Sequence, residues 1–293
     1  MRILALIPFL ALPLTAADPI KVLVWDERQP RQAEAYDNFL GNEIAAHLGA
    51  LPGLTVVSVG QDDPGHGLGT LDEQDVLVWW GHVRQGEVPD EIGQRIVDRV
   101  RSGKLALITL HSAHWSVPFM EAMYSRTRDD AKRRFPNPDT KIEFVPPPGR
   151  IPPAYDSLVT PAYYAFVRRG KVSQVRVDLP NCVFPGVDAH GKPSMVTVTM
   201  PEHPIMAGLP RQFELPESEM YDEPFHVPEP DQVLFREDWR GGGWFRGGML
   251  WNLGQGKVFY FRPGHETFPV FKDPNVSRIL ENAVRWLGQG VQR

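Results

Sequence analysis

Short apolar runs alternate with amphipathic segments between residues 20 and 110. Runs at 21–25, 54–59, 75–80 and 105–110 are rich in valine, leucine and isoleucine, which is typical of buried strands. Residues 33–48 and 89–100 carry apolar side chains at helical spacing. The alternation predicts an α/β fold in which helices cover both faces of a mostly parallel sheet. The ligand site of such a sheet lies at the carboxyl ends of its strands.

The alternation breaks after the fourth strand, from about residue 125 to 195. This stretch combines mixed charges with prolines at 146–148 and 152–153, so we interpret it as an insertion packed over the sheet, of a kind that often forms lids. Strand-like segments follow at 196–200, 232–235, 243–251 and 256–261, and a last helix is predicted at 275–287. We expect the segments at 232–235 and 243–251 to lie near an edge of the sheet. We therefore expect a single domain over residues 18–290, with an insertion at about 125–195.

The composition is that of an ordinary folded chain, with 42% hydrophobic and 23% charged residues. The formal net charge is -5, and no basic run is long enough to neutralise a series of phosphates, so nucleic acid is not expected as a partner. A homo-oligomer is compatible with these features.

The first 17 residues have the order of a secretory signal peptide. Arg2 precedes an apolar run at 3–14, and small residues at 15–17 form a cleavage site. The alternative, a buried first strand, conflicts with the prolines at 8 and 13. We expect a periplasmic or secreted protein without membrane insertion after cleavage. Cys182 is the only cysteine, so no internal disulfide can form, and its apolar neighbours predict an inert buried thiol.

Histidines follow three of the predicted strands, at His82, at His111 and His114, and at His265, which precedes Glu266. Imidazole transfers protons near neutral pH and binds transition metals when neutral. Each histidine alone could be a hydrogen-bonded structural group, but three such strand ends favour a site. His82, His111 and His265 are candidate ligands for a divalent metal such as zinc, although their spacing matches no compact zinc signature. Ser112 fits a turn residue better than a nucleophile.

Five motifs in order make the chain similar to the ThuA-like (trehalose utilisation) family over residues 20–287, the insertion excepted. They are WWGH at 79–82, LHSAH at 110–114, HPI at 203–205, EMYDEPF at 219–225 and FYFRPGHET at 259–267. The resemblance implies a class I glutamine amidotransferase-like fold, flavodoxin-like in layout, and a role in carbohydrate metabolism. It does not imply amidotransferase activity, because the turn that carries the nucleophilic cysteine in that superfamily corresponds to residues 111–114, which contain no cysteine. Similar members often carry a second histidine where this chain has Gln85.

Several further side chains are candidates for substrate binding. Aromatic rings can stack on sugar faces, as those of Trp79, Trp80, Trp115, Trp244 and Trp251 could. Most large aromatics belong to the core, so we expect only one or two of these at the site and single out Trp80 and Trp115. Arg262 could bind an oxyanion or pair with an acid, as could Arg246. His203 could reach the site or cap a loop. Tyr221 lies in a polar run that includes Asp222, Glu223 and His226, which could line the pocket or form a solvated loop.

Together these features indicate a small-molecule carbohydrate as partner, and an exported enzyme, a lyase or hydrolase, that acts on a glycoside or a 3-keto-sugar derivative. In this interpretation His111 and His114 contribute the base and substrate contacts, and His265 with Glu266 forms an acid/base pair. His82 polarises the substrate or binds a metal. Two alternatives stay open: a non-catalytic carbohydrate-binding module, and a scaffold protein with a structural metal site.

Overall fold

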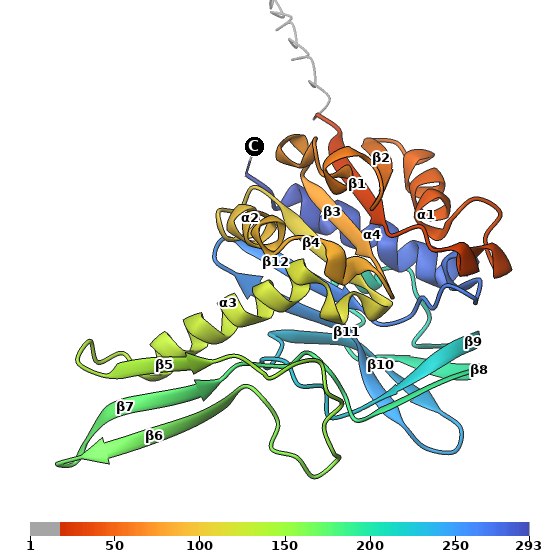
Figure 1. Ribbon diagram of the computed structural model, residues 1–293. Helices are drawn as coiled ribbons and strands as arrows, with labels where there is room; N and C mark the ends of the chain where they lie inside the picture. The colour runs from red at the N-terminus through yellow and green to blue at the C-terminus, as the bar shows by residue number, and fades with distance from the viewer. Residues whose placement is uncertain (1–17, 293) are drawn as a thin grey trace, which may run out of the picture.

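A nine-stranded mixed sheet forms the centre of the protein in the computed structural model, which describes residues 18–292 (Figure 1). Its strand order is β2-β1-β3-β4-β12-β11-β10-β8-β9. The first five strands in that order run parallel: β2 (Leu54–Gly60), β1 (Ile20–Asp26), β3 (Val76–Trp80), β4 (Ala106–Leu110) and β12 (Gly256–Phe261). Their carboxyl ends therefore meet at one edge, where β1 and β3 form the point at which the strand order reverses.

The other four strands are antiparallel: β11 (Trp244–Leu253), β10 (Gln232–Trp239), β8 (Gly186–Val198) and β9 (Gln212–Asp222). The expectation of a mostly parallel sheet thus holds for one half only. The edge position expected for 232–235 and 243–251 is wrong, because β10 and β11 lie inside the sheet and the edges are β2 and β9.

Helices cover both faces of the parallel half. On one face, α1 (Leu40–Gly49) and α4 (Pro274–Gln289) pack their buried aliphatic side chains against Val22, Val24 and Val78. On the other, α2 (Asp90–Arg101) and α3 (Val117–Arg134) pack against Leu23 and Leu77. Successive residues of β1 and β3 serve opposite faces, because side chains alternate along a strand. This explains why these runs are apolar throughout.

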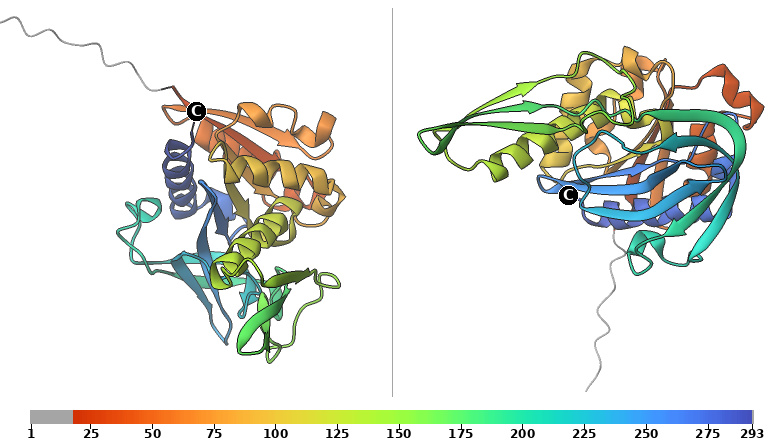
Figure 2. Two further views of the ribbon diagram at one scale, coloured as in Figure 1. Left: turned by 90° about the vertical axis from the view of Figure 1, so that its left-hand side faces the viewer. Right: turned by 90° about the horizontal axis from the view of Figure 1, so that it is seen from below.

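Residues 135–185 hold a second, three-stranded sheet in the order β5-β7-β6. Its strands are β5 (Lys141–Val145), β6 (Ala162–Arg168) and β7 (Lys171–Asp178), and it extends outward beside the end of α3 (Figures 1 and 2). Val175 and Val177 bury themselves against Ala131 of α3. The small sheet itself therefore stands beside the main sheet, and the loop between β5 and β6 and the loop from β7 to β8 reach the strand ends.

Short 3-10 helices complete the fold, at Pro30–Glu34, Pro64–Gly67, Leu71–Glu73, Gln85–Glu87, His111–Trp115, Pro204–Met206 and Val270–Lys272. Cys182 is fully buried and burial raises the pKa of its thiol, in keeping with an inert group. Between residues 18 and 292, no helix combines the length and the apolar character needed to cross a membrane. The signal peptide expected at 1–17 lies outside the described residues.

Candidate active site

The loop after β3 is held by a carboxylate from the neighbouring strand. Glu27 directly follows β1 and is fully buried. Its oxygens accept hydrogen bonds from the backbone N–H groups of Val83, Arg84 and Gln85, at 2.9, 2.9 and 3.2 Å. Sequence reasoning assigned Glu27 no role, although an acidic residue directly after a buried strand was the available signal. Glu27 fixes the turn that presents His82.

His82 is bonded to Glu266 across the edge of the sheet. The distance from Nδ1 of His82 to Oε2 of Glu266 is 2.7 Å, and the His82 side chain keeps 26% of its surface exposed. Burial alone would lower the pKa of His82, but the bond and the charge of Glu266 outweigh it and raise that pKa. Burial would likewise raise the pKa of Glu266, yet His82 holds it at about 2. Glu266 is therefore ionised, and its charge favours the protonated form of His82.

His265 was expected to pair with Glu266, but its Nδ1 lies 3.6 Å from that carboxylate. Instead, Nδ1 accepts a hydrogen bond from the backbone N–H of Thr267 at 3.2 Å and contacts the Thr267 hydroxyl at 2.8 Å. Burial, followed by the charge of His111, lowers the pKa of His265 to about 4. A neutral imidazole whose Nδ1 accepts a bond carries its proton on Nε2. His265 is therefore a neutral hydrogen-bond donor at pH 7.

His111 occupies a strained turn at the end of β4. Its backbone φ is 53°, a value uncommon for any residue other than glycine, and such strain concentrates at functional positions. The ring Nδ1 of His111 donates to the carbonyl of Arg262 at 2.9 Å. The hydroxyl of Tyr260 donates to the backbone carbonyl of His111 at 2.8 Å. These bonds fix the ring with Nε2 facing the site.

Three imidazole rings meet in this arrangement. The ring centroids of His82 and His111 are 6.0 Å apart, those of His82 and His265 5.4 Å, and those of His111 and His265 5.6 Å. The turn before His265 needs glycine, because Gly264 has a φ of 131° and a Cβ there would lie 2.5 Å from the Phe271 ring. The structure thus brings together histidines from the ends of three neighbouring strands.

Strand β9 adds a carboxylate that sequence reasoning did not assign. Oε2 of Glu219 lies 2.8 Å from Nε2 of His111, yet no hydrogen bond with proper geometry reaches that buried oxygen from any described residue. Burial would raise the pKa of Glu219, but the neighbouring His111, with His265 and His82, lowers it to about 2. Glu219 is therefore an ionised carboxylate with an unused acceptor at the wall of the site.

Tyr221 lies two residues further along β9, so it faces the same side of the sheet as Glu219. Its hydroxyl is 3.0 Å from the Ser112 hydroxyl and 3.3 Å from Nε2 of His111. The solvated loop that was the alternative for the 221–226 run is wrong for Tyr221, which is 2% exposed. Ser112, in the turn after β4, joins this network through its hydrogen bond with Tyr221.

His114 is held in one tautomer by the loop before β8. Its Nδ1 donates to the carbonyl of Cys182 at 2.6 Å, so the lone pair of Nε2 is free. Burial, the largest cause, lowers the pKa of His114 to about 3, so the ring is neutral. Gln85 lies behind these groups. It donates to the carbonyl of Ser112 at 2.7 Å and accepts from Trp79 at 3.2 Å, so it supports the turn.

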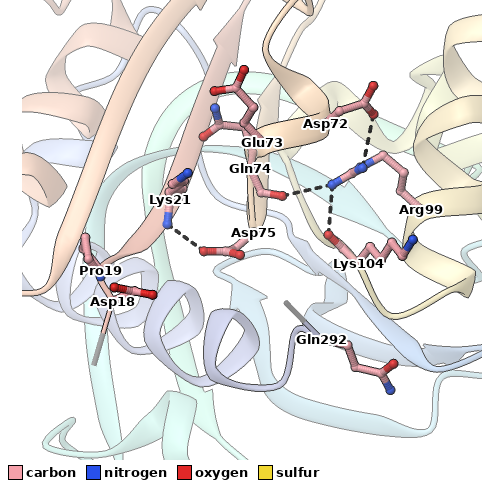
Figure 3. A pocket seen from close by; sticks show the side chains of 10 residues that line it. All are labelled: Asp18, Pro19, Lys21, Asp72, Glu73, Gln74, Asp75, Arg99, Lys104 and Gln292. Carbon is pink, nitrogen blue, oxygen red and sulfur yellow. Dashed lines mark hydrogen bonds and ion pairs between the residues drawn. The ribbon is translucent and has the colours of Figure 1, made fainter. Parts of the chain in front are cut away.

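A pocket of about 430 Å³ opens beside the cluster. His82, Ser112, His114, Glu219 and Tyr221 line its inner end. Its outer end, where the lining side chains are exposed or half-buried, is formed by Val83, Trp115, Arg150, Pro152 and Val187, and Val183, Phe184 and Pro185 line it from the loop before β8. A larger hollow, of about 630 Å³, lies at the amino ends of the strands (Figure 3). Charged side chains there form ion pairs with one another, such as Arg99 with Asp72 at 3.1 Å. We therefore place the candidate site at the carboxyl ends of the strands.

Three residues expected to bind substrate do not line the pocket. Trp80 is fully buried and donates to the carbonyl of Gly264 at 2.9 Å. Arg262 is fully buried in an ion pair with Glu237, so it has no surface to offer a ligand. His203 accepts a hydrogen bond from the N–H of Ile205 at 3.2 Å, and its ring packs on Trp286 of α4. Trp80 and Arg262 instead support the turns from beneath.

The candidate metal ligands differ in one member from the set expected. His82, His265 and Glu266 each offer a ligand atom, and these atoms all lie within 4.8 Å of one another. Glu266 thus takes the place expected for His111, whose Nε2 faces Glu219. Two histidines and a glutamate are a donor set found in catalytic zinc sites.

Comparison with known proteins agrees with this architecture. The model of the ThuA family, described as trehalose utilisation, matches residues 21–287. A protein described as ThuA-like from Parabacteroides merdae ATCC 43184 has a similar structure, with a TM-score of 0.57 and 14% identity over 94% of this chain and 92% of its own. Another from Bacteroides uniformis ATCC 8492 has a TM-score of 0.53 and 15% identity over 94% of each chain. No curated protein matches the sequence. The two structures bear on the fold alone.

Proposed function

Because the chain belongs to the ThuA family, described as trehalose utilisation, we propose that it is a carbohydrate-metabolising enzyme acting on a glycoside or its 3-keto derivative. One observation carries the proposal. Ionisable groups that follow β3, β4 and β12 or lie within β9, namely His82, His111, Glu266 and Glu219, converge beside a pocket lined by both apolar and polar side chains. Pockets of this composition take small organic ligands.

A 3-keto group makes elimination feasible without the usual pair of catalytic carboxylates. The ketone acidifies the C2–H bond, so a base can remove that proton while the C–H electron pair forms an enolate with a C2–C3 double bond. As the ketone re-forms, that electron pair makes the C1–C2 double bond, the C1–O bond breaks with its electrons on the oxygen, and an acid protonates the departing oxygen. Water can add to the product to complete hydrolysis.

The structure offers groups for each proton transfer. Two at the pocket wall can accept the C2 proton: Nε2 of neutral His114, and the carboxylate of Glu219 with its unused acceptor. His82, held by Glu266, has a raised pKa and supplies the proton to the leaving oxygen. His265, with its proton on Nε2, can donate a hydrogen bond to the ketone oxygen.

A thermal-shift and turnover screen over trehalose, other disaccharides and their 3-keto derivatives tests this proposal. We expect at least one sugar to raise the melting temperature of the wild type and to be consumed, and His111→Ala and His265→Ala to abolish turnover. Sugar binding without consumption would favour the non-catalytic binding module instead, which Trp115 at the pocket wall would also suit. Unchanged turnover in both variants would refute the catalytic assignment.

A divalent metal such as zinc fits the same groups. Bound by His82, His265 and Glu266, it would supply a Lewis acid that polarises a substrate oxygen.

If zinc binds here, His82 acts as a ligand instead of as the proton donor, and purified protein should contain about one equivalent of zinc, because catalytic sites hold one ion with three protein ligands. Elemental analysis should find the metal in the wild type and in Glu202→Gln, a distant control, but not in His265→Ala. Chelation should reduce turnover. If the metal is absent from the wild type, the proton-transfer roles stand alone. If its removal lowers only the melting temperature and no sugar binds, the structural scaffold is favoured.

We also propose export to the periplasm or the medium, on the order of basic, apolar and small residues at 1–17.

A further inference from the structure

The outer end of the pocket carries a cation from the insertion. Arg150 lies in the loop between β5 and β6, and its guanidinium carbon is 3.5 Å from the centroid of the Trp115 ring. Both residues line the pocket. Stacking of this kind fixes the plane of the guanidinium and leaves the N–H groups along its edge free to bind.

Arg150 stands out from the other charged groups of the pocket because nothing balances its charge. His82 is paired with Glu266, and Glu219 lies 2.8 Å from His111. By contrast, no carboxylate among residues 18–292 lies within ion-pair distance of Arg150. Partial burial without a counter-charge lowers the pKa of Arg150. Arg150 is exposed where the pocket opens, so its N–H groups can be reached by a ligand from solvent.

Arg150 lies close enough to the histidines for its charge to act on one of them. It contributes to the lowered pKa of His114, after burial and His111. Trp115 stacks with Arg150, and Phe184 packs on His114 with ring centroids 4.9 Å apart; both rings line the pocket and suit the faces of a sugar. A ligand lying along this wall would have its reacting end at His114 and its other end at Arg150.

We propose that the natural substrate is an acidic carbohydrate whose anionic group binds Arg150 at the outer end of the pocket. This inference rests on the proposed function, since it names the substrate class of that site. A carboxylate or a phosphate would provide the paired acceptors that a guanidinium edge matches. In this arrangement Arg150 selects and orients the substrate, and the histidine cluster acts on its neutral end.

Calorimetric titration with matched probes tests the inference. Methyl glucuronide and glucose 6-phosphate supply the two anionic groups, and methyl glucoside is the neutral counterpart. We expect the wild type to bind at least one acidic probe about tenfold or more tightly than methyl glucoside, since a charge-assisted bond of about 1.4 kcal/mol gives that ratio. The acidic probe that gains more identifies the group. Arg150→Gln should remove the preference, and Arg150→Lys should keep part of it.

Arg168→Gln is the matched control, because Arg168 is exposed on β6 and does not line the pocket; it should leave the preference intact. Equal binding of acidic and neutral probes by the wild type, no binding of either acidic probe, or a preference that survives in Arg150→Gln would each overturn the inference. His111→Ala should keep the preference for acidic probes. This separates the inference from the proposed function, which fails if turnover is unchanged in both His111→Ala and His265→Ala.

Discussion

Replacing Glu237 with alanine is expected to lower the free energy of unfolding by about 3–5 kcal/mol, the cost of leaving a buried charge unpaired. Glu237 on β10 and Arg262 after β12 are both fully buried and form a two-pronged ion pair. Ser194 of β8 donates to the same carboxylate at 2.8 Å. Without Glu237, the guanidinium stays in the core with no counter-charge.

Urea denaturation followed by fluorescence measures this loss. The matched control is Asp238→Ala on the same strand, where Asp238 forms an exposed pair with Arg236. Exposed pairs contribute about 0–1 kcal/mol, so the control should change stability little. If both variants lose the same amount, the buried pair does not have the importance that its burial indicates.

The Glu237–Arg262 pair also connects the antiparallel half of the sheet to the candidate site. Nη1 of Arg262 donates to the carbonyl of Glu219 at 2.5 Å, and the carbonyl of Arg262 accepts from His111 at 2.9 Å. Loss of the pair would therefore displace two site residues as well as destabilise the fold. Arg262 thus positions Glu219 and His111 from the core and does not contact the pocket itself.

Replacing Glu266 with glutamine is expected to reduce kcat by about 100- to 10,000-fold, the contribution of a positioned proton donor. The carboxylate raises the pKa of His82, so removing its charge leaves less of the imidazolium at neutral pH. Glutamine keeps the size and an acceptor oxygen, so the shape of the pocket is retained. Affinity for the sugar should therefore change far less than kcat.

Steady-state kinetics together with calorimetric binding separate these effects. Glu229→Gln is the control, because the Glu229 side chain is 85% exposed and outside the pocket; its kcat should equal that of the wild type. A Glu266→Gln protein with normal kcat would exclude His82 and Glu266 as the acid. One that loses binding and kcat equally would indicate that Glu266 holds the substrate itself.

Segments with a strong local pattern were predictable. The apolar runs at 21–25, 54–59, 75–80 and 105–110 form β1 to β4, and the helix expected at 275–287 forms within Pro274–Gln289. The helix expected over 33–48 is shorter, Leu40–Gly49, and a 3-10 turn precedes it. Asp26 accounts for the break, because its carboxylate accepts from Gln32 and from the N–H of Gly41, both at 2.7 Å.

Two of the elements that escaped prediction, α3 and β9, did so because their polar residues find partners far along the chain. Helix α3 carries many charges, and Arg126 is buried on it through an ion pair with Asp231 at 2.6 Å. Strand β9 reads as a polar segment, but Glu219 lies against His111, 108 positions earlier in the sequence. Neither partner lies within the window in which periodicity is visible.

By itself, the sequence determined that histidines follow three strands and that parallel strands bring their carboxyl ends together, which suffices to cluster His82, His111 and His265. Only the tertiary structure decided which groups pair. It placed Glu266 on His82, put Glu219 beside His111, and buried Trp80 and Arg262 under the turns. The physical reason is that strand position follows from local hydrophobic pattern, whereas the partner of a polar side chain depends on distances between elements that no local pattern contains.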